Sequence, residues 1–265
     1  MRRRKVKIGA YQFAVTGDMK CNMEIIKKAV EQAALEKVRL LVFPECALTG
    51  YPPYDLESPV DINFEQLARF HEELQTMAVR HDIFIVAGTI LKEKDEYLNS
   101  AIVFAPDGEN TVYYKRALWG WDKDNFRAGS SIGVFKADNL KIGIRICYEV
   151  RFPEFFRELY KEGTDLNIIL FYDVSQKDDP ERYELIKSHI RTRAVENVCY
   201  TLTVNTIYPY QTAPTALFDR SGHVLKEPAG NTENLMIYDL NFTEMDFGEQ
   251  GRKQISDMYV IHPGC

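Results

Sequence analysis

Cys147 lies where a predicted strand turns into a predicted helix, a position at which a thiol can act as a nucleophile. Apolar side chains recur at every second residue, at Ile142, Ile144 and Ile146, as in a strand. A helix beginning at a proline is predicted over 153–162. A cysteine on such a turn presents its sulfur to solvent or to a pocket, and backbone N–H groups of the turn can face an anionic intermediate. The alternative is a buried structural cysteine.

Two ionisable side chains follow other predicted strands. Glu45 comes just after an apolar run at 38–43, and Lys115 follows a short predicted strand at 111–114. Open α/β sheets place their chemistry at the carboxyl ends of strands, so a carboxylate, an ammonium and a thiol are expected to meet at one edge. The alternative for Glu45 and Lys115 is an ion pair on the surface.

These three groups are sufficient for covalent hydrolysis of an amide. The thiolate is the attacking form of cysteine, and a nearby Lys115 ammonium favours it electrostatically. Glu45 can accept the thiol proton, donate it to the leaving nitrogen, and then activate water against the thioester. The Lys115 ammonium and the backbone N–H of Tyr148 are suitable donors to the tetrahedral oxyanion.

Several segments of the chain resemble the nitrilase superfamily of carbon–nitrogen hydrolases, in its amidase-like branch. Phe-Pro-Glu at 43–45, Tyr-Lys at 114–115 and Ile-Cys-Tyr-Glu-x-Arg-Phe-Pro-Glu at 146–154 are similar to the three signature segments of this family, in the same order. Flanking segments that also resemble the family are 6–12, Asp18 with Asn22, 193–197 and 219–225.

The resemblance implies an α/β fold, the α-β-β-α sandwich of this family, as a single domain spanning 1–265. It implies Glu45 as general base and acid, Lys115 as oxyanion stabiliser and Cys147 as nucleophile, with no cofactor and no metal. It also implies a homodimer or larger homo-oligomer, with the tail 241–265 packed across the partner.

Asp122 is the first departure from the family pattern. Members of the family often carry a second active-site Glu before a Phe and a Gly, and counting back from Phe126 places Asp122 at that position. Its side chain is one methylene shorter, so its reach differs by roughly 1.5 Å. Asp122 either orients the substrate in the manner of the Glu or is a solvated loop acid.

Arg145 is the second departure, two residues before Cys147 and so on the same face of the predicted strand. An arginine beside the nucleophile could bind a substrate carboxylate through two hydrogen bonds. The alternative is a structural ion pair with an internal acid, such as Glu149 or Asp173.

The third departure is Tyr172, with Asp173, after the predicted strand 166–171. The family often has proline and small or amide residues here, so a tyrosine and an acid are expected to reshape the pocket. Tyr51 and Tyr148, beside Glu45 and Cys147 in the motif segments, complete the predicted set of substrate-binding or orienting residues.

The elements that must position these residues alternate between strand and helix. Strands are predicted near 5–12, 38–43, 83–90, 100–105, 111–114, 141–147, 166–171, 199–205, 214–219, 223–226 and 235–240. Helices are predicted near 19–36, 63–80, 153–162 and 180–197.

Composition narrows the class of protein. The 265 residues carry 45% hydrophobic and 27% charged residues, which is ordinary for a globular protein. The net charge of −6 argues against a nucleic-acid partner. The basic start at 1–5 is followed by no signal-type apolar segment, and no apolar run has the length of a membrane span. The five cysteines are an odd number without close pairing, which predicts a reducing, cytoplasmic location.

The sequence therefore predicts a hydrolase of a non-peptide C–N bond in a small amide, an ω-amide or an N-carbamoyl compound, releasing ammonia. Two alternatives stay open, namely a nitrile-hydrolysing nitrilase and a catalytically silent binding or assembly module of the same fold. A Cys–His dyad with His189 is a rival mechanism for Cys147.

Overall fold

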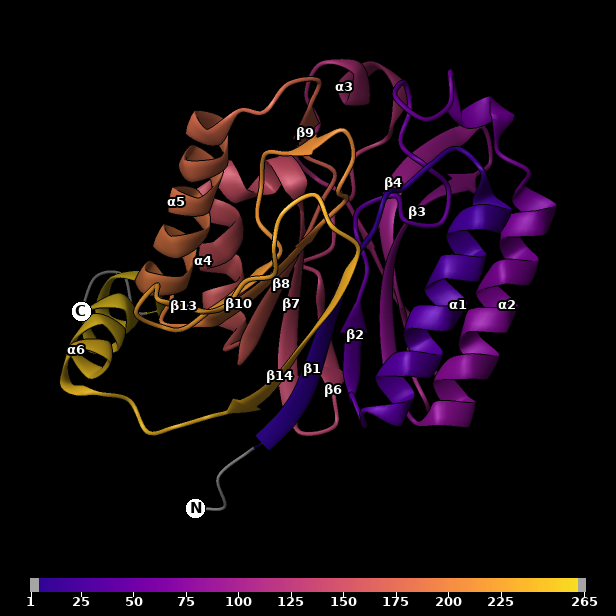
Figure 1. Cartoon of the computed structure of the whole chain (residues 1–265). Coiled ribbons are helices and arrows are strands. Elements are labelled where there is room, and N and C mark those ends of the chain that lie inside the picture. Colours follow the sequence, from indigo (N-terminus) through magenta and orange to yellow (C-terminus); the bar gives the residue numbers. More distant parts are fainter. Residues whose placement is uncertain (1–4, 262–265) are drawn as a thin grey trace.

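Two six-stranded sheets face one another and carry helices on both outer faces (Figure 1). The computed structural model describes residues 5–261. The rest of the basic start, at 1–4, and the segment 262–265 with Cys265 lie outside the described residues. The arrangement is the α-β-β-α sandwich that the resemblance implies. No helix within 5–261 is both long enough and apolar enough to span a bilayer.

The first sheet is covered by two helices from the first third of the chain (Figure 1). Its strand order is β14 (Asn234–Asn241), β1 (Lys5–Gln12), β2 (Leu40–Val42), β3 (Phe84–Glu93), β4 (Glu96–Phe104) and β5 (Thr111–Tyr114). The covering helices are α1 (Met19–Leu35) and α2 (Phe64–His81). The side chain of Asp18 caps α1 by accepting from the N–H groups of Lys20 and Cys21.

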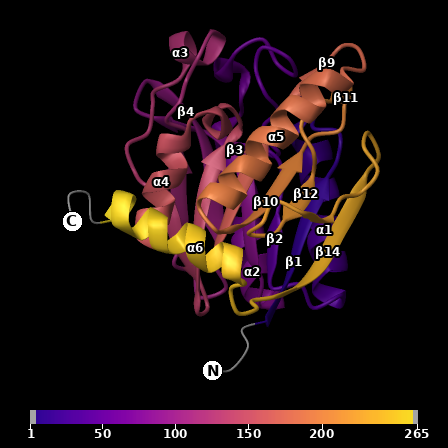
Figure 2. The ribbon, with the colours of Figure 1, turned by 90° about the vertical axis from the view of Figure 1, so that its left-hand side faces the viewer.

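The second sheet has the order β13 (Val224–Lys226), β12 (Ala216–Phe218), β10 (Tyr200–Asn205), β8 (Leu166–Phe171), β7 (Leu140–Ile146) and β6 (Val134–Ala137). Its outer face is covered by α4 (Pro153–Glu162) and α5 (Pro180–Glu196), and α6 (Phe247–Ser256) crosses beneath them (Figure 2). The hydroxyl of Tyr160 on α4 donates to Asp257, just after α6, at 2.6 Å.

Short elements connect these layers. They are the two-stranded sheet β9 (Val174–Ser175) with β11 (Tyr210–Gln211), α3 (Trp121–Asn125), the 3-10 helices Pro59–Asp61 and Cys147–Arg151, and the π-helix Asp257–Ile261.

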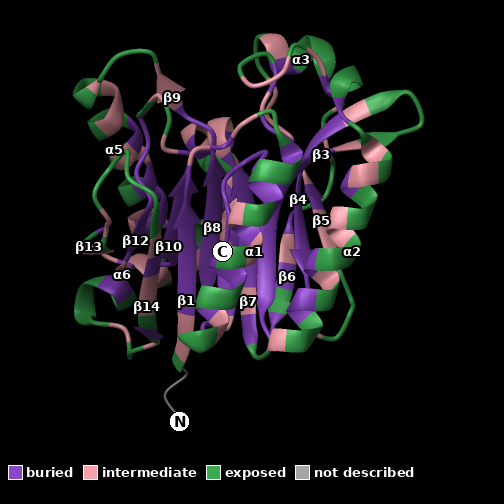
Figure 3. Ribbon diagram, turned by 45° about the vertical axis from the view of Figure 1, so that its right-hand side comes forward, coloured by how far each residue is buried: buried purple, intermediate pink, exposed green. Residues whose placement is uncertain are grey.

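The buried hydrophobic side chains form three clusters. The strands of both sheets are largely buried, whereas the helices have exposed outer faces (Figure 3). Leu40 and Val42 of β2 point between the two sheets, whereas Leu41 between them packs under α1 and α2. Ile142 and Ile144 of β7 join the layer between the sheets, and a third cluster lies beneath α4 and α5. Because both sheets are covered on both faces, their central strands are apolar along their length.

Strand direction brings the predicted site residues to one edge. β1, β2 and β3 are parallel, as are β7, β8 and β10. β5 pairs antiparallel with β4, which pairs antiparallel with β3, so β5 runs in the direction of β3. Glu45, Lys115 and Cys147 therefore all follow strands that end on the same side of the sandwich.

The structure differs from the predicted elements mainly where sequence signals are weak. β4 begins at Glu96 rather than near residue 100, because polar residues extend its hairpin with β3 as far as the Glu93–Glu96 pair. α6 was not predicted, although Asp246 and Glu249 form a capping box at its start. The strand β6 and the short helix α3 were also not predicted.

Gly88 on β3 packs directly against the backbone that carries Glu45. A Cβ atom at this position would lie 2.6 Å from Glu45 Cα and would also meet the carbonyl oxygen of Pro44. Since these are backbone atoms, they can yield only if the end of β2 shifts.

We predict that Gly88→Ala lowers the free energy of unfolding by about 2–3 kcal/mol through this overpacking. The matched control is Gly251→Ala in α6, where a Cβ meets nothing within 4 Å. That change should raise stability by about 0.5–1 kcal/mol, because alanine favours the helix. Urea denaturation measures both, and equal stabilities for the two variants would contradict the prediction.

Candidate active site

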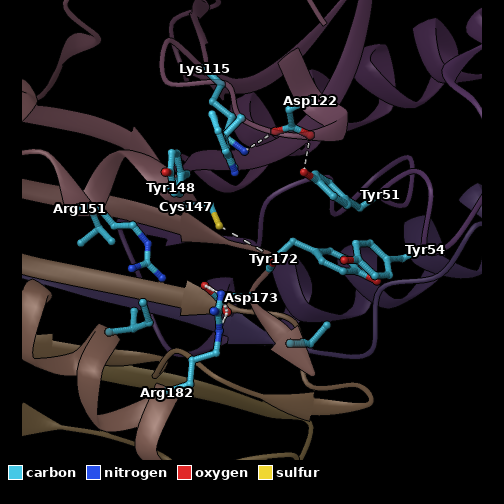
Figure 4. Close-up of a pocket in the computed structure, with 14 residues that line it drawn as sticks. Tyr51, Tyr54, Lys115, Asp122, Cys147, Tyr148, Arg151, Tyr172, Asp173 and Arg182 are labelled. Carbon is cyan, nitrogen blue, oxygen red and sulfur yellow. Dashed lines mark hydrogen bonds and ion pairs between the residues drawn. The ribbon is translucent and has the colours of Figure 1, made fainter. Parts of the chain in front are cut away.

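A cavity of about 320 Å³ opens at the edge where these strands end (Figure 4). Its lining includes Tyr51, Lys115, Asp122, Cys147, Tyr148 and Tyr172. Glu45 is fully buried and contacts two of these residues. Among residues 5–261, no three His, Cys, Asp or Glu side chains converge as metal ligands would.

Cys147 sits on a strained turn. It has φ +45° and begins the 3-10 helix directly after β7. A left-handed conformation is costly for a residue with a Cβ and is found where the surrounding structure enforces it. In the first turn of a helix the backbone N–H groups have no partner within the helix. The N–H of Tyr148 lies in that turn, as the oxyanion role requires.

Glu149 enforces the turn. Its buried carboxylate accepts from the N–H of Ile146 at 2.7 Å, from the hydroxyl of Tyr113 at 2.7 Å and from the N–H of Arg116 at 2.7 Å. These bonds tie the end of β7 to the segment that follows β5. Sequence reasoning considered Glu149 only as a partner of Arg145, because nothing in its local pattern indicates these contacts.

Glu45 is held by three donors. Its Oε1 accepts from Lys115 Nζ at 2.8 Å and from Asn99 Nδ2 at 2.7 Å, while Oε2 accepts from the N–H of Tyr172 at 2.8 Å. Burial raises the pKa of Glu45, and the charge of Lys115 opposes this effect. A carboxylate with these opposing influences can both accept and return a proton. Asn99, on β4, was not identified from the sequence.

Lys115 is buried between two carboxylates. Its Nζ lies 2.8 Å from Glu45 Oε1 and 2.7 Å from Asp122 Oδ2. Burial alone would lower the pKa of Lys115, but Glu45, Tyr51 and Asp122 outweigh it and raise that pKa. The side chain therefore remains an ammonium, fixed in position before any substrate arrives.

The Cys147 thiol is neutral at rest. Burial raises its pKa, the charge of Glu45 raises it further, and Lys115 only partly opposes them. The sulfur lies 4.0 Å from the carbonyl oxygen of Tyr172. Lys115 was expected to favour the thiolate, and it does act in that direction, but its ammonium is already shared between two carboxylates. A nucleophilic role for Cys147 would therefore require the thiol to lose its proton as the sulfur attacks.

Asp122 lies inside the site and is not a solvated loop acid. It is buried on α3, where Oδ2 accepts from Lys115 and Oδ1 accepts from the hydroxyl of Tyr51 at 2.5 Å (Figure 4). The ring of Tyr51 stacks on Tyr172 with centroids 4.9 Å apart and an interplanar angle of 19°. Tyr51 and Tyr172 thus form one wall, which orients the shorter carboxylate toward Lys115.

Arg145 lies outside the cavity, which excludes contact with a substrate carboxylate there. Its fully buried guanidinium donates from Nη1 to the carbonyls of Ile132 and Ile144, each at 2.7 Å, and from Nε to that of Phe155 at 3.1 Å. The prediction assumed that residues 145 and 147 share a strand face, but β7 ends at Ile146, before Cys147.

The alternative interpretation, that Arg145 has a structural role, is confirmed, but the predicted partners Glu149 and Asp173 are wrong. Arg145 Nη2 lies 3.7 Å from Glu158, whereas Glu149 is engaged with the turn and Asp173 with Arg182. His189 of the rival dyad lies on α5 and does not line the cavity.

Two arginines that were not predicted line the cavity (Figure 4). Arg182 forms a two-point ion pair with Asp173, at 2.9 Å from Nε and 3.1 Å from Nη2. Arg151 lies over the ring of Tyr148, with 5.8 Å between its Cζ and the centroid. Within the described part of the chain, Arg151 has no carboxylate partner. Its place four residues after Cys147 in the motif was visible in the sequence, but its freedom from ion pairs was not.

Comparisons with known proteins show which family and fold this chain shares. The family model for carbon-nitrogen hydrolases matches residues 7–247. A 2-oxoglutaramate amidase from Bacillus subtilis is 30% identical over 69% of this chain and 70% of its own length, and a nitrilase from Pyrococcus abyssi is 30% identical over 70% and 69%. The crystal structure of an amidase from Nesterenkonia sp. superposes with a TM-score of 0.78 at 24% identity, covering 89% of this chain and 90% of that one.

We predict that Glu45→Gln and Lys115→Met move the alkylation profile of Cys147 in opposite directions. Glu45 raises the pKa of the thiol and Lys115 lowers it, so losing the carboxylate shifts the pH midpoint down and losing the ammonium shifts it up. In the unaltered protein the midpoint lies above that of free cysteine. Mass spectrometry of the Cys147 peptide after iodoacetamide treatment at graded pH separates it from exposed Cys21. Shifts in the same direction would contradict this account.

Proposed function

Because this chain belongs to the carbon–nitrogen hydrolase family, as its signature segments predict, we propose that it is an amidase for the ω-amide of a small carboxylic acid, acting through a Cys147 thioester. The observation that carries the proposal is the cavity itself. It holds Cys147 beside a fixed ammonium at one side and an uncompensated arginine, Arg151, on its wall.

The first half of the reaction forms the thioester. Glu45 accepts the proton of the Cys147 thiol as the sulfur attacks the amide carbonyl. The negative charge that develops on oxygen is stabilised by Lys115 and by the N–H of Tyr148. Both donors are fixed in advance, the first between two carboxylates and the second by the turn that Glu149 holds.

The second half returns the proton and consumes water. The protonated Glu45 donates its proton to the amide nitrogen, and the C–N bond breaks. Ammonia departs, and the acyl group remains bound to the Cys147 sulfur as a thioester. Glu45 then takes a proton from a water molecule as the water oxygen attacks the thioester carbonyl. When the resulting tetrahedral intermediate collapses, the C–S bond breaks and Glu45 returns the proton to the Cys147 sulfur. Asp122 acts by orienting Lys115, and Tyr51 by orienting Asp122.

The charges on the wall support an anionic amide as the substrate. Lys115 is committed to Glu45 and Asp122, and Arg182 is committed to Asp173. Arg151 remains to pair with a carboxylate of the substrate, which arginine binds through two parallel hydrogen bonds. The 2-oxoglutaramate amidase of Bacillus subtilis bears the name of such an ω-amide.

A nitrilase is the second candidate, because a relative of equal identity carries that name. The same thiol can add to a nitrile carbon, so the distinction lies in the substrate and not in the residues. A catalytically silent module is disfavoured by the intact contacts among Glu45, Lys115 and Asp122, since a buried ion pair of this kind often adds no net stability over apolar residues of similar volume.

We also propose a homo-oligomer in the cytoplasm. Phe247 in α6 and Tyr259 in the π-helix that follows are 94% and 73% exposed, which supports burial against a second copy. The cysteines within 5–261 are all free, which supports a reducing compartment.

We expect the protein to release ammonia from glutaramate and to lose at least about 10³-fold in kcat with Cys147→Ala, because the covalent route disappears. A coupled ammonia assay over neutral amides, ω-amides, N-carbamoyl amino acids and nitriles measures this. Turnover of nitriles alone would favour the second candidate. Ammonia release that survives in the Cys147→Ala variant would rule out the thioester.

Arg151→Gln should lower kcat/KM for glutaramate by about 10- to 100-fold, mainly through KM, because a charge-assisted ion pair with the substrate carboxylate is lost. Pentanamide lacks the carboxylate and serves as the matched control, with kcat/KM expected to change by less than about threefold. An equal loss on both amides would show that Arg151 supports the site without binding the carboxylate.

A further inference from the structure

Asp173 and Arg182 form a charge pair on the wall of the cavity, outside the Glu45–Lys115–Cys147 cluster (Figure 4). Nε and Nη2 of Arg182 reach the two oxygens of Asp173 at 2.9 and 3.1 Å. Asp173 also lies close enough to Cys147 for its charge to act on the thiol. The pair therefore borders the space that a substrate on Cys147 must occupy.

The two partners differ in how firmly they are held. Asp173 is buried, its carboxylate accepts from the hydroxyl of Thr212, and its backbone bonds the side chain of Asn205 through both N–H and carbonyl, at 3.0 and 2.7 Å. Arg182 lies in the first turn of α5, and its side chain is 42% exposed. The acid is thus fixed, whereas the arginine is held chiefly by that acid.

The fixed acid determines how many anions the cavity can take. An arginine at a cavity wall is a ready site for a carboxylate, and the cavity has two, Arg151 and Arg182. Of these two arginines, only Arg182 is paired with a carboxylate of the residues 5–261. A second substrate carboxylate approaching Arg182 would have to displace Asp173, which has nowhere to move, or bear its repulsion.

We propose that Asp173 is a specificity-determining residue that masks Arg182 as a latent second anion site, so that the cavity accepts substrates with one carboxylate and rejects those with two. The inference rests on the proposed function in taking the substrate to be an anion. It concerns the number of charges on the substrate and leaves the reaction at Cys147 unchanged.

The test measures protection of Cys147 against iodoacetamide by butyrate and by ethylmalonate, which differ by one carboxylate. In the unaltered protein butyrate should protect and ethylmalonate should protect poorly. Asp173→Asn keeps the size of the side chain and one oxygen to accept from Thr212, but it removes the charge and one of the two acceptors of Arg182. It should tighten ethylmalonate protection at least about tenfold. In the double variant with Arg182→Met that gain should disappear.

Two further variants make the result specific. Asp138→Asn removes another aspartate paired with an arginine, Arg39, at a distant surface site, and should leave both protection constants unchanged. Arg182→Met alone leaves the negative charge of Asp173 without its counter-charge. Repulsion between Asp173 and the carboxylate of butyrate should then weaken butyrate protection about tenfold. This variant alters a half-exposed side chain and tests the proposal even if Asp173→Asn does not fold.

Equal ethylmalonate protection in the unaltered and Asp173→Asn proteins would overturn the inference, as would a gain that survives in the double variant. A purely structural role for the pair would change thermal stability without changing the preference between the two anions. Failure of the proposed function would look different. Glutaramate would release no ammonia, while the protection constants would still respond to Asp173.

Discussion

The buried ammonium of Lys115 is the interaction on which the arrangement of the site depends. A charge removed from water is tolerated only with close counter-charges, and here two carboxylates, Glu45 and Asp122, lie within 2.8 Å of it. These residues come from three separate parts of the chain, after β2, after β5 and on α3. Because the charge requires all of them together, the loops must close over one edge of the sandwich. The backbone of β3 at Gly88 and the Asn99 side chain on β4 hold Glu45 in register with that charge.

Strand ends and the identity of the reacting groups could be predicted from the sequence because they depend on local pattern. The alternation at Ile142, Ile144 and Ile146 is a property of neighbouring residues, and it located β7 to within a residue. The same pattern failed for Arg145 at the point where the strand ended. Alternation places side chains on one face only while the backbone stays extended. The backbone of Cys147 is left-handed, so Cys147 does not continue the strand face on which Arg145 lies.

Contacts between distant segments could not be predicted, and they give the site its electrostatics. The local sequence indicates only that Glu149 belongs to the turn, yet its partners include Tyr113 on β5 of the opposite sheet and Arg116 just after that strand. The masking of Arg182 by Asp173 and the freedom of Arg151 are equally invisible without coordinates. Composition gives the number of charges in a chain, but only packing decides which of them remain uncompensated in a cavity.

A neutral resting thiol has a consequence for selectivity. With the pKa of Cys147 raised by burial and by Glu45, little thiolate is present to react with adventitious electrophiles. In the mechanism that we propose, proton transfer to Glu45 becomes favourable only as negative charge moves from sulfur to the substrate oxygen, where Lys115 and the turn N–H stabilise it. Activation is therefore coupled to correct placement of an amide carbonyl. The wall that carries Arg151 and the Asp173–Arg182 pair lies in the same cavity. For an anionic amide, the proposed recognition of its charge and the formation of the nucleophile would thus be linked through the position of one substrate.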